Sequence, residues 1–205
     1  MTMKLYYAPG ACSLAPHIAL FELGLSVQAV KVNLRDKTSE DGKDFWAINP
    51  KGSVPFLSLG NGESVSEVAV ILQYLADLKP EKNLIAKWGT PERYQGMQWL
   101  NYIATEMHKG YSPLWNKQMP DEAKKIALEN LQRRFQFLEN HFASHAFLMG
   151  DNYSVADAYL FTVLNWSRHL KLDLTEYPHL VNYVEKVKAR PATVEAMKAE
   201  GIWRE

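Results

Sequence analysis

The segment that decides the fold is Leu5-Tyr6-Tyr7-Ala8-Pro9-Gly10-Ala11-Cys12-Ser13-Leu14. It starts in a short apolar strand, Pro9-Gly10 breaks that strand, and Ser13 is expected to cap a helix that follows. Cys12 therefore lies at the mouth of a helix, where unpaired N–H groups and the positive end of the dipole favour a thiolate over a thiol. It is the single cysteine of the chain. Position alone leaves two alternatives, a reactive thiol and a small buried apolar residue.

The composition limits the functions that the chain can have. Its 205 residues suffice for one large domain or two small ones, and 23 basic residues balance 23 acidic ones. A net charge of zero gives no electrostatic case for nucleic acid or an acidic membrane. The sequence has no second cysteine, no Cys/His cluster with zinc spacing, no P-loop and no apolar run of ~18 residues. We therefore expect a cytoplasmic protein that needs no metal.

The N-terminal part of the chain is predicted to alternate strands and helices. Strands are expected at 3–7 and 27–34, and the helix between them should stop at Gly24. After a variable stretch, Gly60-Asn61-Gly62 predicts a β-hairpin, and Ser66 is expected to cap a last helix. The order β-α-β followed by β-β-α, with a cysteine at the first helix, indicates an α/β thioredoxin-like fold.

The C-terminal part is predicted to be all helical. A polar break at 79–83 separates the two parts, so we assign 1–80 to the thioredoxin-like domain, 81–87 to a linker and 88–205 to the helical domain. Thr90-Pro91-Glu92 supplies a cap, a first-turn proline and an acid in that order. Further helices are expected from 120 onwards and at 155–164, 177–189 and 193–199. The helix at 155–164 is apolar nearly all round, which marks it as central, and Ser154 with Asp157 forms a capping box at its start.

Two motifs in the first domain have the chemistry to bind a small peptide. A cis Val54-Pro55 bond would leave the N–H and C=O of Val54 to pair with a bound peptide, whereas the more frequent trans form is ordinary at an edge strand. Ser66-Glu67-Val68 lies at a predicted helix N-terminus, where N–H groups bind carboxylates and Glu67 could hold an ammonium group. Alternatively, Ser66 merely caps and Glu67 merely complements the dipole.

Two histidines, His108 and His17, give a less specific indication of function than these motifs. Within Glu106-Met107-His108-Lys109-Gly110, His108 is either a catalytic group or a helix C-terminal partner of the dipole. His17 lies one turn into the helix behind Cys12, and we interpret it as structural.

The motifs taken together resemble the cytosolic glutathione transferase family, and within it the bacterial beta class, over the whole length of the chain. The strings that carry the resemblance are 5–14, quoted above, Ile48-Asn49-Pro50-Lys51-Gly52, Tyr74-Leu75-Ala76-Asp77, His108-Lys109-Gly110-Tyr111-Ser112-Pro113-Leu114 and Val155-Ala156-Asp157-Ala158-Tyr159-Leu160-Phe161. The resemblance implies a homodimer of subunits that each join a thioredoxin-like domain to a helical one.

The resemblance also implies a glutathione site. Cys12 and His108 match the residues at the glutathione sulfur and are the expected catalytic pair. The remaining expected contacts are Val54 to the cysteinyl backbone, Glu67 and Val68 to the γ-glutamyl end, Lys37 to the glycyl carboxylate, and Asn101, Thr105 and Lys109 from the long helix or from a partner subunit. Val68 stands where relatives often have Gly or Ser, and Thr105 replaces a Ser. An electrophile pocket is expected around Tyr111, Trp115 and Trp166, of which Trp166 matches the family pattern.

The expected function is the conjugation of glutathione to hydrophobic electrophiles, as in detoxification. A cysteine at the sulfur site adds a second chemistry, because it exchanges with disulfides; glutathione-dependent disulfide reductase or peroxidase activity is therefore a further expectation. Two alternatives stay open: a glutathione-dependent isomerase or dehalogenase, and a non-catalytic adaptor of the same fold. The presence of Cys12, Val54 and Glu67 argues against the adaptor. Whether Cys12 bonds covalently to glutathione stays open as well.

Overall fold

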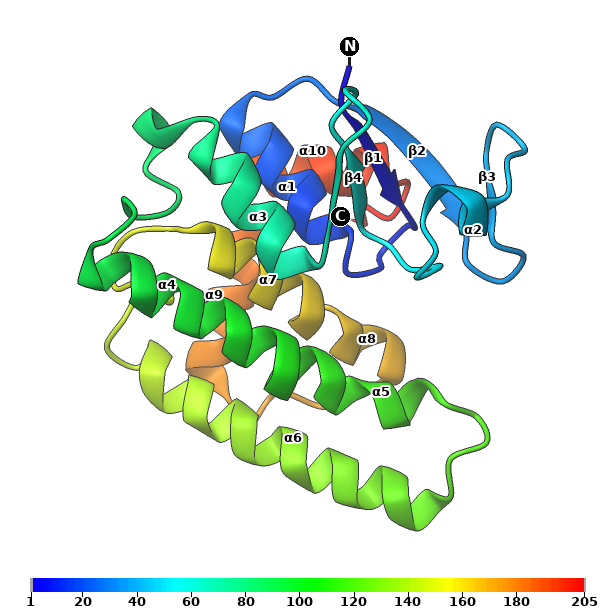
Figure 1. Cartoon of the computed structure of the whole chain (residues 1–205). Helices are drawn as coiled ribbons and strands as arrows, with labels where there is room; N and C mark the ends of the chain where they lie inside the picture. The colour runs from blue at the N-terminus through cyan, green and yellow to red at the C-terminus, as the bar shows by residue number, and fades with distance from the viewer. Residues whose placement is uncertain (1, 205) are drawn as a thin grey trace. The chain divides into compact units, whose positions relative to one another are not determined.

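Strand β1 (Lys4–Tyr7) forms the middle of a five-stranded sheet with the order β3-β2-β1-β4-β5. It pairs in parallel with β2 (Gln28–Asn33) and antiparallel with β4 (Phe56–Ser58). The edge strands β5 (Ser64–Ser66) and β3 (Thr38–Ser39) are both antiparallel to their neighbours. This computed structural model describes residues 2–204 of the chain, and it confirms the predicted order of strands and helices (Figure 1).

The two faces of the sheet are covered by different helices. Successive side chains of a strand point to opposite faces, so Leu5 and Tyr6, both buried, lie on different sides. Tyr6 joins an apolar cluster with Phe45 of the short helix α2 (Phe45–Ile48). Helices α1 (Leu14–Leu23) and α3 (Val68–Asp77) pack against each other on the other side, as Figure 1 shows. The stretch between β2 and β4, for which the sequence predicts no element, thus holds β3 and α2.

Two of the predicted helix caps are wrong. The hydroxyl of Ser13 makes no cap contact; it accepts from Ala8 N (3.1 Å) and donates to Ala8 O (3.2 Å), which ties the helix start to the end of β1. Ser66 is the last residue of β5, and Glu67 takes the N-cap position of α3. The predicted stop at Gly24 is confirmed, since this residue ends α1 in the left-handed conformation (φ 63°).

The chain divides into two compact units, one of residues 1–83 with 190–205 and one of 84–189. The predicted helical domain, 88–205, is therefore too long at its C-terminal end. Helix α10 (Pro191–Ala199) packs against α1, and the guanidinium of Arg190 donates to both carboxylate oxygens of Glu22 at 2.6 and 3.0 Å. Helical periodicity shows which face of a helix is apolar but not which core that face covers.

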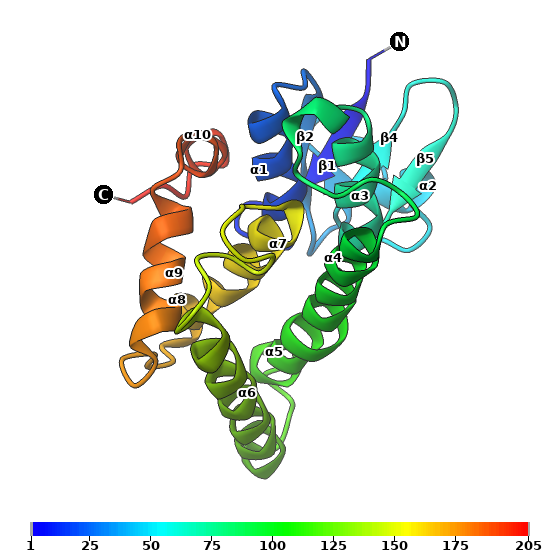
Figure 2. The ribbon, with the colours of Figure 1, turned by 90° about the vertical axis from the view of Figure 1, so that its left-hand side faces the viewer.

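The second unit is built from helices, drawn from green to orange in Figure 2. Its α4 starts at the predicted Thr90 cap, whose hydroxyl accepts from Arg93 N at 3.3 Å. The helix then continues without a break through a π-helical segment, η2, into α5. The elements of the unit are α4 (Pro91–Tyr102), η2 (Ile103–His108), α5 (Lys109–Trp115), α6 (Asp121–Phe142), α7 (Val155–Leu164), α8 (Trp166–Leu170) and α9 (Pro178–Lys188). The sequence predicts no helix at α8, and the 3₁₀ turn η1 (Pro80–Lys82) crosses the predicted boundary between the first domain and the linker.

Helix α7 is the centre of the second unit, as predicted, because all of its residues are buried. The predicted capping box between Ser154 and Asp157 is present. The buried carboxylate of Asp157 accepts from Ser154 N and Oγ, both at 2.8 Å, from Leu148 N at 2.9 Å and from the hydroxyl of Tyr183 at 3.2 Å. One carboxylate thus joins the start of α7 to the preceding loop and to α9.

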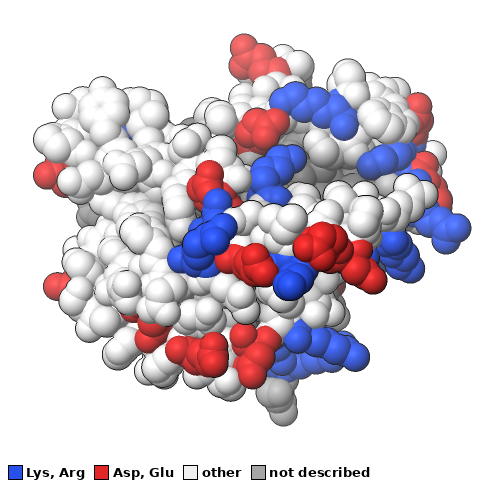
Figure 3. Space-filling view, turned by 90° about the horizontal axis from the view of Figure 1, so that it is seen from below, with Lys and Arg blue, Asp and Glu red and all other residues white. Residues whose placement is uncertain are grey.

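The charges are distributed without a dominant sign. On the face drawn in Figure 3, acidic and basic side chains alternate, and neither gathers into a continuous patch. Within residues 2–204, no helix has the length and hydropathy needed to cross a bilayer.

The Asp157 network leads to a stability prediction. Replacing Asp157 by Ala leaves buried donors without their acceptor, so we expect the free energy of unfolding to fall by about 3 kcal/mol. Urea denaturation followed by circular dichroism measures this loss. The matched control is Asp151→Ala, an exposed residue of the same loop, for which the change should stay within about 0.5 kcal/mol. Equal losses in the two variants would contradict the role given to the network.

Candidate functional site

Cys12 lies in the turn between β1 and α1, two residues before the helix begins. Its thiol is half-buried and donates to the carbonyl oxygen of Val54 at 3.2 Å. The Val54-Pro55 peptide bond is cis, which agrees with the peptide-binding alternative and not with the more frequent trans form. The C=O of Val54 is not free, contrary to our expectation, because the thiol uses it. The structure thus brings two predicted site residues into direct contact.

The loop that carries Cys12 is hydrogen-bonded to Glu200, near the C-terminal end of the chain. Gly10 N donates to Glu200 Oε2 at 2.8 Å, and His17 Nδ1 lies 2.9 Å from Glu200 Oε1. The Glu200 side chain is fully buried, and the His17 ring lies between Tyr7 and Phe21, with centroid distances of 5.4 and 5.5 Å. His17 is therefore structural, as predicted. Sequence reasoning missed Glu200, which lies near the other end of the chain and carries no local signal.

The acidic end of the predicted site is already paired. Glu67 has a positive φ (71°), a conformation that non-glycine residues rarely adopt and that often marks functional positions. Its Oε1 accepts from Lys51 Nζ at 2.7 Å, and the same ammonium group donates to Ser66 Oγ at 3.1 Å. Val68, the first residue of α3, is buried. We did not predict a role for Lys51, although it lies within one of the family strings.

The basic end is paired as well. Lys37 also has a positive φ (53°), its Nζ donates to Gly52 O at 2.7 Å, and the same atom lies 5.5 Å from the centre of the Trp46 ring. Gly52 has a φ of +57°, and a Cβ at this position would lie 2.5 Å from the Trp46 ring, so only glycine fits. The predicted residues Lys37, Glu67 and Cys12 therefore all contact the single segment 51–54.

That segment is fixed by one buried amide. Asn49 is 2 % exposed; its Nδ2 donates to Ser53 O at 2.8 Å and its Oδ1 accepts from Lys51 N at 3.1 Å. The backbone that leads into Val54 is thus held rigidly by a side chain rather than by a strand partner. Asn49 is a supporting residue that sequence reasoning did not single out.

In the second unit, four predicted contacts lie on one continuous helix. Asn101 belongs to α4, Thr105 and His108 to η2, and Lys109 to α5. The Thr105 hydroxyl donates to Asn101 O at 3.0 Å. Asn101, Thr105 and Lys109 are exposed. His108 is the last residue of η2, and the helix continues into α5, so its interpretation as a helix C-terminal dipole partner is wrong. π-Helical turns of this kind are frequent at functional sites.

His108 is held by two aromatic side chains. Its Nδ1 lies 2.7 Å from the Tyr159 hydroxyl, and its ring stands edge-on to Trp166 with 4.9 Å between centroids. A hydroxyl contact at Nδ1 fixes the orientation of the ring. The ring of His108 is half-buried.

The predicted pocket residues cluster around Trp166, which lies 5.8 Å from the Tyr111 ring and 6.3 Å from the Trp115 ring. Tyr111 is fully buried and its hydroxyl lies 2.6 Å from Ser167 Oγ; burial raises the pKa of this phenol, which stays neutral. Tyr111 is therefore a core residue and not the pocket-lining residue that we expected. Trp115 is 48 % exposed.

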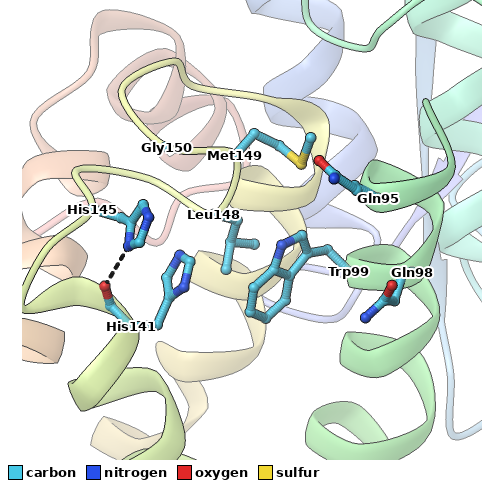
Figure 4. A pocket seen from close by; sticks show the side chains of 8 residues that line it. All are labelled: Gln95, Gln98, Trp99, His141, His145, Leu148, Met149 and Gly150. Carbon is cyan, nitrogen blue, oxygen red and sulfur yellow. Dashed lines mark hydrogen bonds between the residues drawn. The ribbon is translucent and has the colours of Figure 1, made fainter. Parts of the chain in front are cut away.

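A separate cavity of about 300 Å³ opens in the second unit (Figure 4), and none of the predicted residues lines it. Gln95, Gln98 and Trp99 of α4 form one wall, and His141 and His145 form another. The two imidazole rings are stacked, with 4.5 Å between centroids, and burial lowers the pKa of His141. This cavity is distinct from the cluster around His108. Among residues 2–204, no group of three or more His, Cys, Asp or Glu side chains could hold a metal ion.

Glu200 generates a prediction. Replacing it by Ala leaves Gly10 N and the buried His17 without their carboxylate, so we expect the free energy of unfolding to fall by about 2 kcal/mol. The alkylation rate of the Cys12 thiol should change as well, because the loop loses its anchor. Urea denaturation and alkylation by iodoacetamide measure the two effects. The control is Glu195→Ala in α10, the helix that Glu200 caps; Glu195 is exposed and paired with Lys198, and its replacement should change neither value. A Glu200 variant indistinguishable from this control would refute the anchoring role.

Comparison with known proteins places the chain in a family. The model of the glutathione S-transferase N-terminal domain matches residues 1–77, and that of the C-terminal domain matches 102–191. Glutathione S-transferase GstA of Escherichia coli O157:H7 is 42 % identical over 98 % of this chain and 100 % of its own. A glutathione transferase structure from Methylococcus capsulatus is 52 % identical (TM-score 0.97; 98 % and 100 % covered), and a sphingomonad glutathione S-transferase solved with glutathione is 41 % identical (0.94; 98 % and 100 %). The chain belongs to the glutathione S-transferase family.

Proposed function

We propose that the protein is a glutathione transferase that binds glutathione in its first unit and transfers the thiolate to hydrophobic electrophiles. The observation that carries the proposal is the contact of the Cys12 thiol with the Val54 carbonyl, 3.2 Å long. It puts a sulfur-binding group beside a backbone segment that can pair with a peptide. A peptide with a central cysteine would then have its sulfur at Cys12.

The charged ends of glutathione match the charged groups of the first unit. Glu67 would hold the γ-glutamyl ammonium, and the N–H groups that open α3 at Val68 would bind the adjacent carboxylate. Lys37 would bind the glycyl carboxylate. The N–H and C=O of Val54 would pair with the cysteinyl residue, so the Val54 carbonyl would exchange the Cys12 thiol for a substrate N–H.

The transfer step needs the glutathione thiol to lose its proton. Cys12 and His108 would donate hydrogen bonds to the resulting thiolate, which favours the charged form. The thiolate sulfur then attacks the electrophilic carbon and forms a C–S bond, while the electron pair leaves with the departing group or moves onto the acceptor. Trp115 and Trp166 are the aromatic residues that we propose for the electrophile pocket, and the physiological role would be detoxification.

The second unit and a partner subunit would complete the site. Asn101, Thr105 and Lys109 are exposed residues of the helix that carries His108, and we propose that they contact glutathione bound to the same or to a second subunit of a homodimer. We also propose a cytoplasmic location.

A second candidate activity follows from the residue at the sulfur. The Cys12 thiolate can attack the disulfide of an oxidised substrate, which releases one thiolate and forms a mixed disulfide. Attack by glutathione on that bond restores the Cys12 thiol and leaves the substrate glutathionylated or glutathione oxidised. A serine or tyrosine at this position could not do this. Isomerase or dehalogenase chemistry would use the same glutathione site with a different electrophile.

The two chemistries are separated by one variant. In Cys12→Ala, we expect disulfide reduction to be abolished, because the attacking sulfur is gone. Conjugation should fall by no more than about tenfold, since only one hydrogen bond to the thiolate is lost. A chlorodinitrobenzene assay and a hydroxyethyl disulfide assay measure the two activities. If neither activity changes, Cys12 is not catalytic; if neither occurs in the parent protein although glutathione binds, the adaptor is favoured.

The Tyr159 contact gives a further prediction. Tyr159→Phe removes the hydroxyl 2.7 Å from His108 Nδ1, so His108 loses its fixed orientation. We expect kcat/KM for conjugation to fall by about tenfold, with a shift in its pH profile. The exposed Tyr94→Phe is the control, and a Tyr159 variant with the parent's activity and pH profile would show that this contact does not support catalysis.

A further inference from the structure

Lys51 occupies the carboxylate that the substrate's ammonium group would need. Its Nζ lies 2.7 Å from Glu67 Oε1 and 3.1 Å from Ser66 Oγ. The backbone of Lys51 is fixed by Asn49 Oδ1, which accepts from Lys51 N at 3.1 Å. The side chain therefore starts from a fixed point and reaches the turn that opens α3.

The Lys51–Glu67 pair can be exchanged at low cost. Both side chains are exposed, Lys51 to 56 % and Glu67 to 66 %. Exposed ion pairs of this kind add little to stability, because water and salt screen them. A substrate ammonium group held by further contacts can therefore displace the lysine from the carboxylate.

We propose that Lys51 exchanges partners on binding and selects a ligand end that carries both an ammonium and a carboxylate group on one carbon. This inference rests on the proposed function and names the specificity of the same site. The incoming ammonium takes the place of Lys51 Nζ on Glu67. The incoming carboxylate arrives beside Ser66. Lys51 Nζ lies 3.1 Å from the Ser66 hydroxyl before the exchange, so it is close enough to become the ion-pair partner of this carboxylate.

The exchange leaves every charge paired only when the ligand end is zwitterionic. With such a ligand, the Glu67 carboxylate pairs with the ligand ammonium and the ligand carboxylate pairs with Lys51. Without a ligand, Lys51 pairs with Glu67. Every charge therefore has a partner of opposite sign in both states. A ligand whose carboxylate is an amide brings its ammonium next to a displaced Lys51 with no negative group to pair with it. A ligand without the ammonium brings its carboxylate close to Glu67. Each of these mismatches costs binding free energy through repulsion between like charges.

The test compares glutathione with its analogue in which the γ-glutamyl α-carboxylate is an amide. Calorimetric titration measures both dissociation constants for the full-length protein, for Lys51→Met, which keeps the length without the charge, and for Lys51→Arg, which keeps the charge. We expect Lys51→Met to bind glutathione about two- to fivefold more weakly than the parent, the range for exposed ion pairs. Its binding of the amide should be equal or tighter, and Lys51→Arg should keep most of the preference. The affinity of the parent for glutathione should also fall more steeply with salt than that of Lys51→Met.

Lys43→Met is the matched control, because Lys43 makes an exposed ion pair with Asp41 in the same unit, away from Glu67. It should bind both ligands as the parent does. Lys51→Met that binds glutathione as tightly as the parent, or more tightly, overturns the exchange and leaves the proposed function intact. A parent protein that binds no glutathione overturns the proposed function together with this inference.

Discussion

The two hydrogen bonds of the Asn49 amide are the constraint on which the first unit's site depends. They fix the turn from Lys51 to Ser53, and each of the site's charged or sulfur-bearing groups is set against this turn or the residue after it. Lys37 contacts Gly52, Glu67 contacts Lys51, and Cys12 contacts Val54. A buried amide with both ends paired is rigid, because leaving either end unpaired would cost about 1–3 kcal/mol. The candidate site is therefore a rigid backbone segment, and the side chains of Lys37, Glu67 and Cys12 are arranged around it.

Two charged residues of the proposed glutathione site, Lys37 and Glu67, are each paired with a group of the protein itself. Lys37 donates to a backbone carbonyl, and Glu67 accepts from a neighbouring lysine. At such a site, substrate binding would exchange hydrogen bonds and ion pairs rather than form new ones on bare charges. An exchange of this kind lowers the net gain per contact, but it avoids leaving charges unsatisfied in either state. Selectivity would then come from the pattern of charges that the substrate must match.

Local patterns predicted the elements well, and they failed where one side chain has several possible partners that only the folded chain decides between. The hairpin around Gly60-Asn61-Gly62 and the helix stop at Gly24 follow from backbone preferences that these residues carry with them. Ser13 is different, because its hydroxyl could cap the helix or bond to Ala8, and only the folded turn selects the second option.

The same distinction holds for the site. Cys12 lies in a family string, and Val54 and Glu67 lie in short motifs with the chemistry to bind a peptide, whereas nothing in the sequence connects Glu200 with Gly10 or assigns Tyr111 to the core. Those outcomes depend on how α10 and α8 pack, which periodicity does not encode.

The π-helical segment 103–108 bears on how chain length can vary among related proteins. A π turn is in effect one residue added to an α-helix, and each residue of an α-helix turns the chain by about 100°. The wider turn absorbs that rotation, so loss of a single residue in this segment would restore an ordinary helix and leave α5 facing the same way. Gly110, at which a Cβ would lie 2.9 Å from Leu131, would still pack against α6. The π turn therefore lets the chain gain or lose one residue here without turning the contact between α5 and α6.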